Sequence, residues 1–261
     1  MKKFMSFLLA LVMCFSVATF AFAAEDVAVM KAYAFNSSED MRGYKNTIES
    51  VEFTLSDVRK NDVNNGDAWD ISATGGNKVL AWLEDSDRNG LYEAYITAKG
   101  EYIYANENSS YLFMGYSALK KISGMNLFKT DKACYMESMF EGCSSLNNLD
   151  VQYFNTSKVL TMKSMFKDCE SLVSFIGLDK LNTSNVVYMN SMFYGCKSLV
   201  KLNLATFDTY KVTKAGSLGF FNAANEISGI ISLLTPIMFV TIKSRSVTSI
   251  RSLYMGASPV R

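Results

Sequence analysis

The chain contains no histidine among its 261 residues, and this absence removes several kinds of chemistry at once. Without an imidazole there is no Ser/His or Cys/His nucleophile pair, and no metal site can use a histidine ligand. Proline is nearly as scarce, and both copies, Pro236 and Pro259, lie close to the C-terminus. Five cysteines are too few for a disulfide scaffold in a chain of this length.

An excess of charge of one sign is also missing. The 26 Lys and Arg residues nearly balance the 25 Asp and Glu residues, so electrostatics give no case for a nucleic-acid partner. Hydrophobic residues make up 49% of the chain, which disfavours a disordered protein. The acidic residues are scattered and form no recurring pair, so a glycosidase of the two-carboxylate kind is disfavoured. We therefore expect a folded, non-catalytic protein with no cofactor and no metal.

The N-terminus reads MKKFMSFLLALVMCFSVATFAFAAED, a basic start followed by a long apolar run and small residues. This pattern predicts a signal peptide over residues 1–23, with cleavage after Ala23 or Ala24. An uncleaved membrane helix is the alternative, because the apolar run is long enough to span a bilayer. We expect the mature protein to be exported and to work extracellularly or at the cell surface.

One phrase occurs three times, as YMESMFEGCSSL at 135–146, TMKSMFKDCESL at 161–172 and YMNSMFYGCKSL at 188–199. A half-unit at 111–126 precedes the first copy. The repeat units begin at residues spaced 26 or 27 apart, Phe128, Phe154, Leu181 and Phe207, and the last of them starts with FDTYKV and then loses the phrase. A period of this length indicates a solenoid, in which each coil buries its apolar face against its neighbours.

Within each unit the apolar spacing changes from steps of three or four residues to a short alternation. The first pattern predicts a helical or 3₁₀ side of the coil, and the second predicts a short strand. The expected fold class is therefore an α/β solenoid, a leucine-rich-repeat-like array of about four coils over 111–215.

The repeated positions are predicted to point inward and to pack against their own copies, so we interpret them as structural rather than catalytic. This ladder comprises Met139, Phe140, Cys143, Leu146, Met165, Phe166, Cys169, Leu172, Met192, Phe193, Cys196 and Leu199. A column of threonines, two of them in NTS triplets, is predicted to hydrogen-bond the backbone at a coil corner rather than to mark glycosylation. These threonines are Thr130, Thr156, Thr183 and Thr209.

The cysteine column could be read in three ways. A line of thiols does not converge on one point, which disfavours a metal site. Disulfides between neighbouring coils are sterically conceivable, but small buried thiols are the favoured interpretation, and the disulfide state stays open. Cys134 lies outside this column, in a variable slot, and we expect it to be the more exposed thiol.

Residues 24–110 have another character and predict a β-rich N-terminal domain that caps the array. Apolar and aromatic segments of strand length alternate there with the turns NNGD, ATGGN and RNG. Asp85, Asp87 and Asn89 resemble the start of a calcium loop, but Ile96 stands where the bidentate Glu should be. A hairpin turn is therefore favoured.

The tail over 216–261 loses the repeat pattern. Its apolar segment GIISLLTPIMFVTI, at 229–242, is followed at once by the basic triplet KSR. Three interpretations stay open: a cap, a short membrane anchor, or a truncated or frame-shifted segment foreign to the fold.

The repeat pattern VxxMxxMFxxCxxLxxLxLxxFxTS resembles the bacterial surface protein 26-residue repeat of BspA-like leucine-rich repeat proteins. The stretches YIYANENSSYLFMGYSALKKISGM and AWDIS…VLAWLED…YEAYITA are similar to segments that precede those repeats in Firmicutes members, so the resemblance covers residues 50–215. It implies a cell-surface protein and, as in some members, an adhesin for host extracellular-matrix proteins such as fibronectin and fibrinogen. The small number of repeats and the tail depart from the pattern.

A solenoid presents an extended face made of the strand residues between its ladder positions. The predicted binding residues on this face are Lys121, Ser123, Asn148, Asp150, Ser174, Lys201 and Asn203. A protein ligand is the expected partner. The alternative is a structural or cell-envelope-associated protein without a host ligand.

Overall fold

The computed structural model of the chain describes residues 27–35, 42–55, 68–76, 78–98, 100–199, 202–204 and 206–213. The predicted signal peptide, the tail from residue 216 and the candidate binding residue Lys201 lie outside the described residues.

A five-stranded sheet joins the N-terminal region to the repeats. Its strands, in the order β2-β3-β4-β1-β6, are β2 (Trp69–Asp70), β3 (Val79–Glu84), β4 (Tyr92–Ala98), β1 (Ile48–Thr54) and β6 (Lys121–Ser123). β3 and β4 form an antiparallel hairpin on the turn that the RNG triplet predicts, whereas β1 runs parallel to both β4 and β6. Because β6 belongs to the repeats, the two regions share one continuous sheet.

Strand β1 lies where the strand of a preceding coil would lie. Its side chains alternate, so that Val51 and Phe53 are buried while Glu52 is exposed. The ring of Phe53 stacks on Phe128, with 4.7 Å between the ring centroids. The N-terminal region therefore covers the apolar end of the first repeat, and a short 3₁₀ segment, η1 (Arg42–Tyr44), precedes β1.

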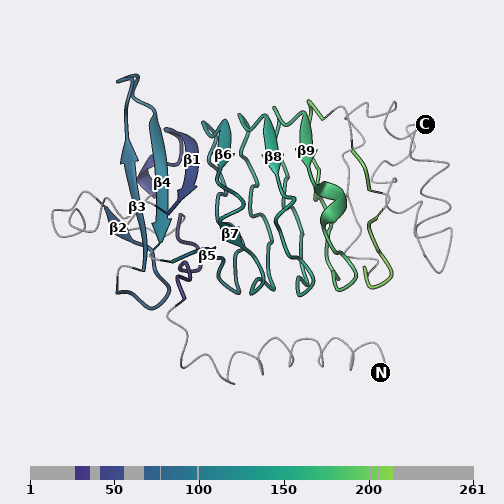
Figure 1. Ribbon diagram of the computed structural model, residues 1–261. Helices are drawn as coiled ribbons and strands as arrows, with labels where there is room; N and C mark the ends of the chain where they lie inside the picture. Colours follow the sequence, from purple (N-terminus) through teal and green to yellow (C-terminus); the bar gives the residue numbers. More distant parts are fainter. Residues whose placement is uncertain are drawn as a thin grey trace.

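From residue 102 the chain forms coils that lie side by side in a row (Figure 1). We number them coil 1 (102–127), coil 2 (128–153), coil 3 (154–180) and coil 4 (181–206). The pairing begins before residue 111, because the N–H of Ile103 already donates to the carbonyl of Leu127 at 2.9 Å.

Neighbouring coils pair in parallel at three places around the coil. β5 (Ile103–Tyr104) pairs with β7 (Phe128–Lys129), and β8 (Asn148–Asp150) pairs with β9 (Ser174–Ile176). A column of single bridges makes the third place and contains Asn108, Tyr135, Thr161 and Tyr188. Each coil is therefore held to the next by backbone hydrogen bonds rather than by side chains alone.

The side of the coil that the spacing predicts to be helical or 3₁₀ consists of turns in the described residues. In coil 2, the N–H groups of Ser138, Phe140 and Gly142 donate to carbonyl oxygens of coil 3 at 2.8–2.9 Å. The intervening N–H of Glu141 instead closes a turn onto the carbonyl of Ser138. A helix would direct its N–H groups to its own coil, so the lateral bonds replace it.

The 27-residue coil 3 places its additional length at a corner. There Gly177, with φ of 74°, separates β9 from a short 3₁₀ segment, η3 (Leu178–Lys180). A Cβ atom at Gly177 would overlap the backbone and Cβ of Gln152 in coil 2. The corner of this longer coil therefore requires glycine, both for its left-handed backbone and for the close approach of the two coils.

Two left-handed backbone positions recur on the turn side of each coil. They are occupied by Tyr111 and Gly115, Ser138 and Gly142, Ser164 and Asp168, and Ser191 and Gly195. At the second position coil 3 has Asp168, with φ of 57°, where the other three coils have glycine. An L-residue with a Cβ is strained in this conformation, although aspartate tolerates it better than most.

We therefore predict that Asp168→Gly stabilises the protein by about 0.5–1 kcal/mol, since it removes this strain and keeps the N–H bond to Tyr194. Urea unfolding followed by circular dichroism measures the change. Asp168→Ala is the control, because alanine keeps the Cβ and should destabilise the fold. Equal shifts for the two variants would assign the effect to the lost carboxylate and contradict the strain argument.

Candidate functional site

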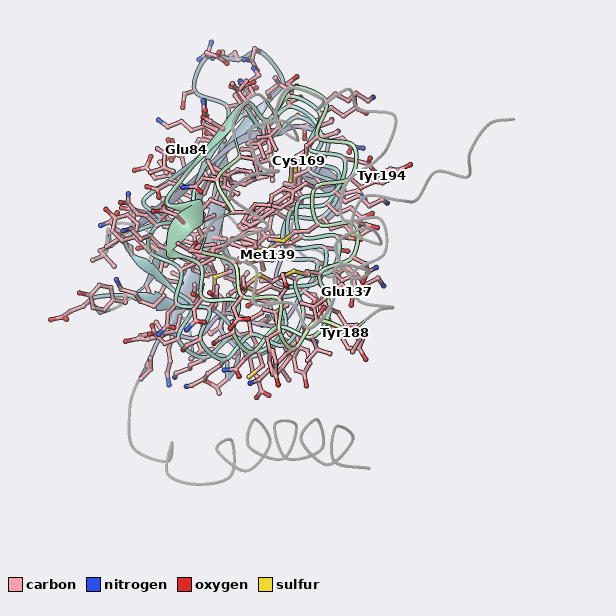
Figure 2. The ribbon with its side chains drawn as sticks, turned by 90° about the vertical axis from the view of Figure 1, so that its right-hand side faces the viewer. Glu84, Glu137, Met139, Cys169, Tyr188 and Tyr194 are labelled. Atoms are coloured by element: carbon pink, nitrogen blue, oxygen red, sulfur yellow. The ribbon has the colours of Figure 1, made fainter. Side chains whose placement is uncertain are left out.

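The repeated Met, Phe, Cys and Leu positions lie in the interior of the row of coils. Eleven of the twelve predicted ladder residues have no exposed surface, and Leu199 is 5% exposed. Figure 2 places Met139 and Cys169 inside the molecule, away from the surface residues Glu137 and Tyr194. The interior is therefore packed with residues that offer no catalytic group to solvent.

The phenylalanines of the ladder form a continuous column of stacked rings. Successive centroids are 5.4, 5.8 and 5.6 Å apart along Phe113, Phe140, Phe166 and Phe193. Offset stacking at such distances adds about 0.5–1.5 kcal/mol per pair beyond the burial of area. The column therefore reinforces the register that the backbone hydrogen bonds between coils establish.

The column begins with a residue that the repeat analysis missed. Phe35 stacks on Phe113 with 4.9 Å between the centroids, and Tyr33 stacks on Tyr111 at 5.9 Å. Tyr33 also has a left-handed backbone, with φ of 58°, as the equivalent residues of the coils do. The only signal in the sequence is the triplet YAF at 33–35, which matches YLF at 111–113.

The thiols of the cysteine column donate hydrogen bonds to the preceding coil. Each Sγ lies 3.1 Å from the carbonyl oxygen of a ladder phenylalanine, pairing Cys143 with Phe113, Cys169 with Phe140 and Cys196 with Phe166. Tyr116 takes the same position in coil 1, and its hydroxyl donates to the carbonyl of Phe35 at 2.7 Å. Each thiol thus adds a second donor to a carbonyl that already accepts a long N–H bond, of 3.2–3.3 Å, from the residue three positions later in its own coil.

None of the cysteines among the described residues forms a disulfide. Burial raises the pKa of Cys143 and of Cys196 to about 12, and it raises the pKa of Cys169 well above its usual range. The thiolate, which is the reactive form, is therefore disfavoured throughout the column.

The expectation that Cys134 is an exposed thiol is wrong, because the residue is buried and only 3% exposed. Its backbone lies between two coils, with its N–H bonded to the carbonyl of Glu107 and its carbonyl accepting from the N–H of Leu160. The slot varies in residue type but stays apolar, and Leu160 is buried there as well. Variation within the repeat therefore does not indicate exposure at this position.

The threonine column lies at a corner and bonds to the next coil. The hydroxyls of Thr130, Thr156 and Thr183 each donate at 3.0 Å to a backbone carbonyl one coil further on. In both NTS triplets the Asn side chain accepts bonds from the N–H and hydroxyl of the serine two residues later. Thr209 follows the last described coil and is half-buried.

The predicted binding residues that the structure describes, all but Lys201, lie on one strand face, which we define as the outward side of β6, β8, β9 and residues 202–204. Lys121, Asn148 and Asn203 are exposed there, and Ser123, Asp150 and Ser174 are half-buried. Ser174 donates to the side chain of Asn148 at 2.8 Å, which links neighbouring coils across the face. The strand face is thus polar and made of small side chains, with Ile176 as its exposed apolar residue.

A second outward surface was missed by the repeat analysis. This turn face comprises three columns, one residue from each of coils 1 to 4: Asn108, Tyr135, Thr161 and Tyr188; Ser110, Glu137, Lys163 and Asn190; and Met114, Glu141, Lys167 and Tyr194. Ser110 and Thr161 are buried, and the other residues of these columns are half-buried or exposed. Figure 2 shows Glu137, Tyr188 and Tyr194 along one side of the molecule, away from Glu84 of β3. Each of its residues lies beside a conserved-looking ladder position, and that placement is the signal that could have located the face.

Two ion pairs cross between coils on the turn face. Lys163 lies 2.8 Å from Glu137, and Lys167 lies 2.6 Å from Glu141. The hydrogen bond to Glu141 is the main cause that raises the pKa of Lys167. Four large side chains of this region, Tyr33, Met114, Tyr188 and Tyr194, are 37–38% exposed.

The acidic turn between β3 and β4 is occupied by its own hydrogen bonds. Asp85 accepts the N–H groups of Asn89 and Gly90, and Asp87 accepts from the backbone and side chain of Asn89. Within the part of the chain that the structure describes, no three His, Cys, Asp or Glu side chains group closely enough to hold a metal ion.

The geometry defines a repeat protein whose coils are joined by backbone ladders and whose outward residues vary. Residues 107–232, slightly less than half of the chain, match a family model described as a Mycoplasma protein of unknown function, DUF285. No curated protein and no solved structure matches the chain. Among the described residues, no helix has the length and apolar character needed to cross a membrane.

The buried thiols predict a pH dependence of stability. Because their pKa values are raised in the folded state, the stability that they contribute is complete below about pH 8.5. This contribution falls as the pH rises toward about 12, because the thiols then ionise only in the unfolded chain. The loss is up to about 1.4 kcal/mol per thiol and pH unit.

Urea unfolding at several alkaline pH values tests this, with Cys196→Ala as the matched variant. Between pH 8 and pH 10, the free energy of unfolding should fall less in the variant than in the wild type. The difference should be about the contribution of one thiol. Parallel pH profiles for the two proteins would contradict a buried, protonated Cys196.

Proposed function

We propose that the chain is a secreted or cell-surface, non-catalytic binding protein, adhesin-like, with a short leucine-rich-repeat-like solenoid as its scaffold. The BspA-like resemblance of the repeat and the match to the repeat-containing family model support this class. The proposed partner is a protein ligand, such as a component of the host extracellular matrix.

The observation that carries the proposal is that each coil has two sets of residues with different roles. Residues that repeat are buried and hold the coils together, whereas the residues exposed on the outside of the coils vary, on a backbone that hydrogen bonds join from coil to coil. A stack of this kind offers an extended surface whose side chains are positioned before the partner arrives, which lowers the entropic cost of binding.

The strand face is the proposed site for this ligand. Lys121, Asn148 and Asn203 are exposed along it, and the Ser174–Asn148 hydrogen bond fixes two of its polar groups. Its mixed charge suits a polar, standard protein–protein contact rather than a strongly basic or acidic partner.

The test is binding of the full chain to immobilised fibronectin, fibrinogen and the producer's own cell walls, with a heat-unfolded sample alongside. We expect saturable binding to a host protein that is weakened about tenfold by charge reversal at Lys121, Asp150 and Lys201. Lys158→Glu, an exposed change at a coil corner, is the matched control and should leave binding unchanged.

Binding to cell walls alone would favour the alternative, an envelope-associated structural role. The absence of binding to all three surfaces would contradict the adhesin proposal.

A further inference from the structure

Two of the three columns of the turn face share an order of charges that is complementary to its own reverse. The column over coils 1 to 4 that contains Glu141 reads Met114, Glu141, Lys167 and Tyr194. Acid stands in coil 2 and base in coil 3, and the neighbouring column repeats this with Glu137 and Lys163. In the Glu141 column, the exposed side chains of Met114 and Tyr194 stand at the two ends.

A second copy can be placed against the turn face by a two-fold axis that lies in the plane of this face, passes between coils 2 and 3 and runs at right angles to the row of coils. Rotation about this axis sets the order of charges in one copy opposite the reversed order in the other. Coil 2 of one copy would then face coil 3 of the other, and each column would face itself. Glu137 would lie opposite Lys163 of the second copy, and Glu141 opposite Lys167 of the second copy. An axis along the row instead would place each carboxylate opposite a carboxylate, which is unfavourable.

The same axis brings the ends of the columns together. Coil 4 of one copy faces coil 1 of the other, so that Tyr194 meets Met114 of the second copy and Tyr188 meets Asn108. Tyr194, Tyr188 and Met114 are 37–38% exposed in the single chain. Tyrosine and methionine are enriched in interface cores, and methionine sulfur packs well against aromatic rings.

We propose that the turn face is an isologous interface between two copies of this chain, with their rows of coils antiparallel. Each ion pair then becomes part of a four-membered network of alternating charge, closed by the second copy. The strand faces remain outside this contact, so the dimer presents two of them, and a weak single site gains affinity through bivalency.

The test uses two charge-reversed variants of the full chain, in sedimentation velocity over a range of micromolar concentrations. The wild type is expected to dimerise. E137K/E141K carries four lysines at the centre of the face and K163E/K167E carries four glutamates, so each alone is expected to be monomeric. An equimolar mixture of the two is expected to form a heterodimer, because acid again faces base.

A wild type that stays monomeric would overturn the proposal, and so would a mixture that forms no heterodimer. Far-UV circular dichroism checks that each variant is folded, because the reversals also break the two ion pairs within the chain.

A second pair of variants leaves the ion pairs intact. Tyr194→Ala removes an end contact and is expected to weaken dimerisation about tenfold. Tyr153→Ala removes an exposed tyrosine from a coil corner outside the turn face and is expected to have no effect. Equal dimerisation of both variants and the wild type would overturn the assignment of the face.

Discussion

The structure depends on one requirement, that the backbone N–H and C=O groups of a coil find partners in its neighbours. A turn-rich coil cannot satisfy these groups alone, as a helix would, and leaving them unpaired in a buried core is costly. The lateral bonds of Ser138, Phe140 and Gly142 show how the requirement is met in coil 2. An internal coil such as coil 3 therefore donates hydrogen bonds to both neighbours and accepts them from both, so it is not complete by itself.

Side chains in the ladders add further hydrogen bonds between coils to those of the backbone. This limits the residue types that fit at the ladder positions. The thiols of Cys143, Cys169 and Cys196 are small enough for the interior and still donate to a carbonyl. Threonine does the same at the corner, with a hydroxyl that reaches the next coil. The repetition in the sequence thus follows from hydrogen-bond geometry as much as from hydrophobicity.

Much of the interior could be predicted, because a residue that recurs every 26 or 27 positions, such as Phe140 or Thr156, has the same surroundings in each coil. The turns could not, since a spacing of three and four is the same in a helix and in turns that are linked by left-handed residues. Phe35 lies far from the repeats in sequence, and only a three-letter match connects it to them. Cys134 shows a different limit, because variation between copies does not distinguish an exposed slot from a buried apolar one. The turn face could not be predicted, because it is defined by the variable residues that lie next to one another in neighbouring coils. The alignment of these residues is known only once the coils are stacked.

Gly177 has a consequence for how such chains change length over generations. The additional residue of coil 3 is taken up at a corner, where the glycine lets the chain turn close to Gln152, and the buried columns of rings and thiols on either side stay aligned. Small differences in unit length are therefore neutral for the interior. A whole unit added to or removed from such a stack lengthens or shortens the outer surface by one strand spacing without redesign of the core, because the interior repeats from coil to coil.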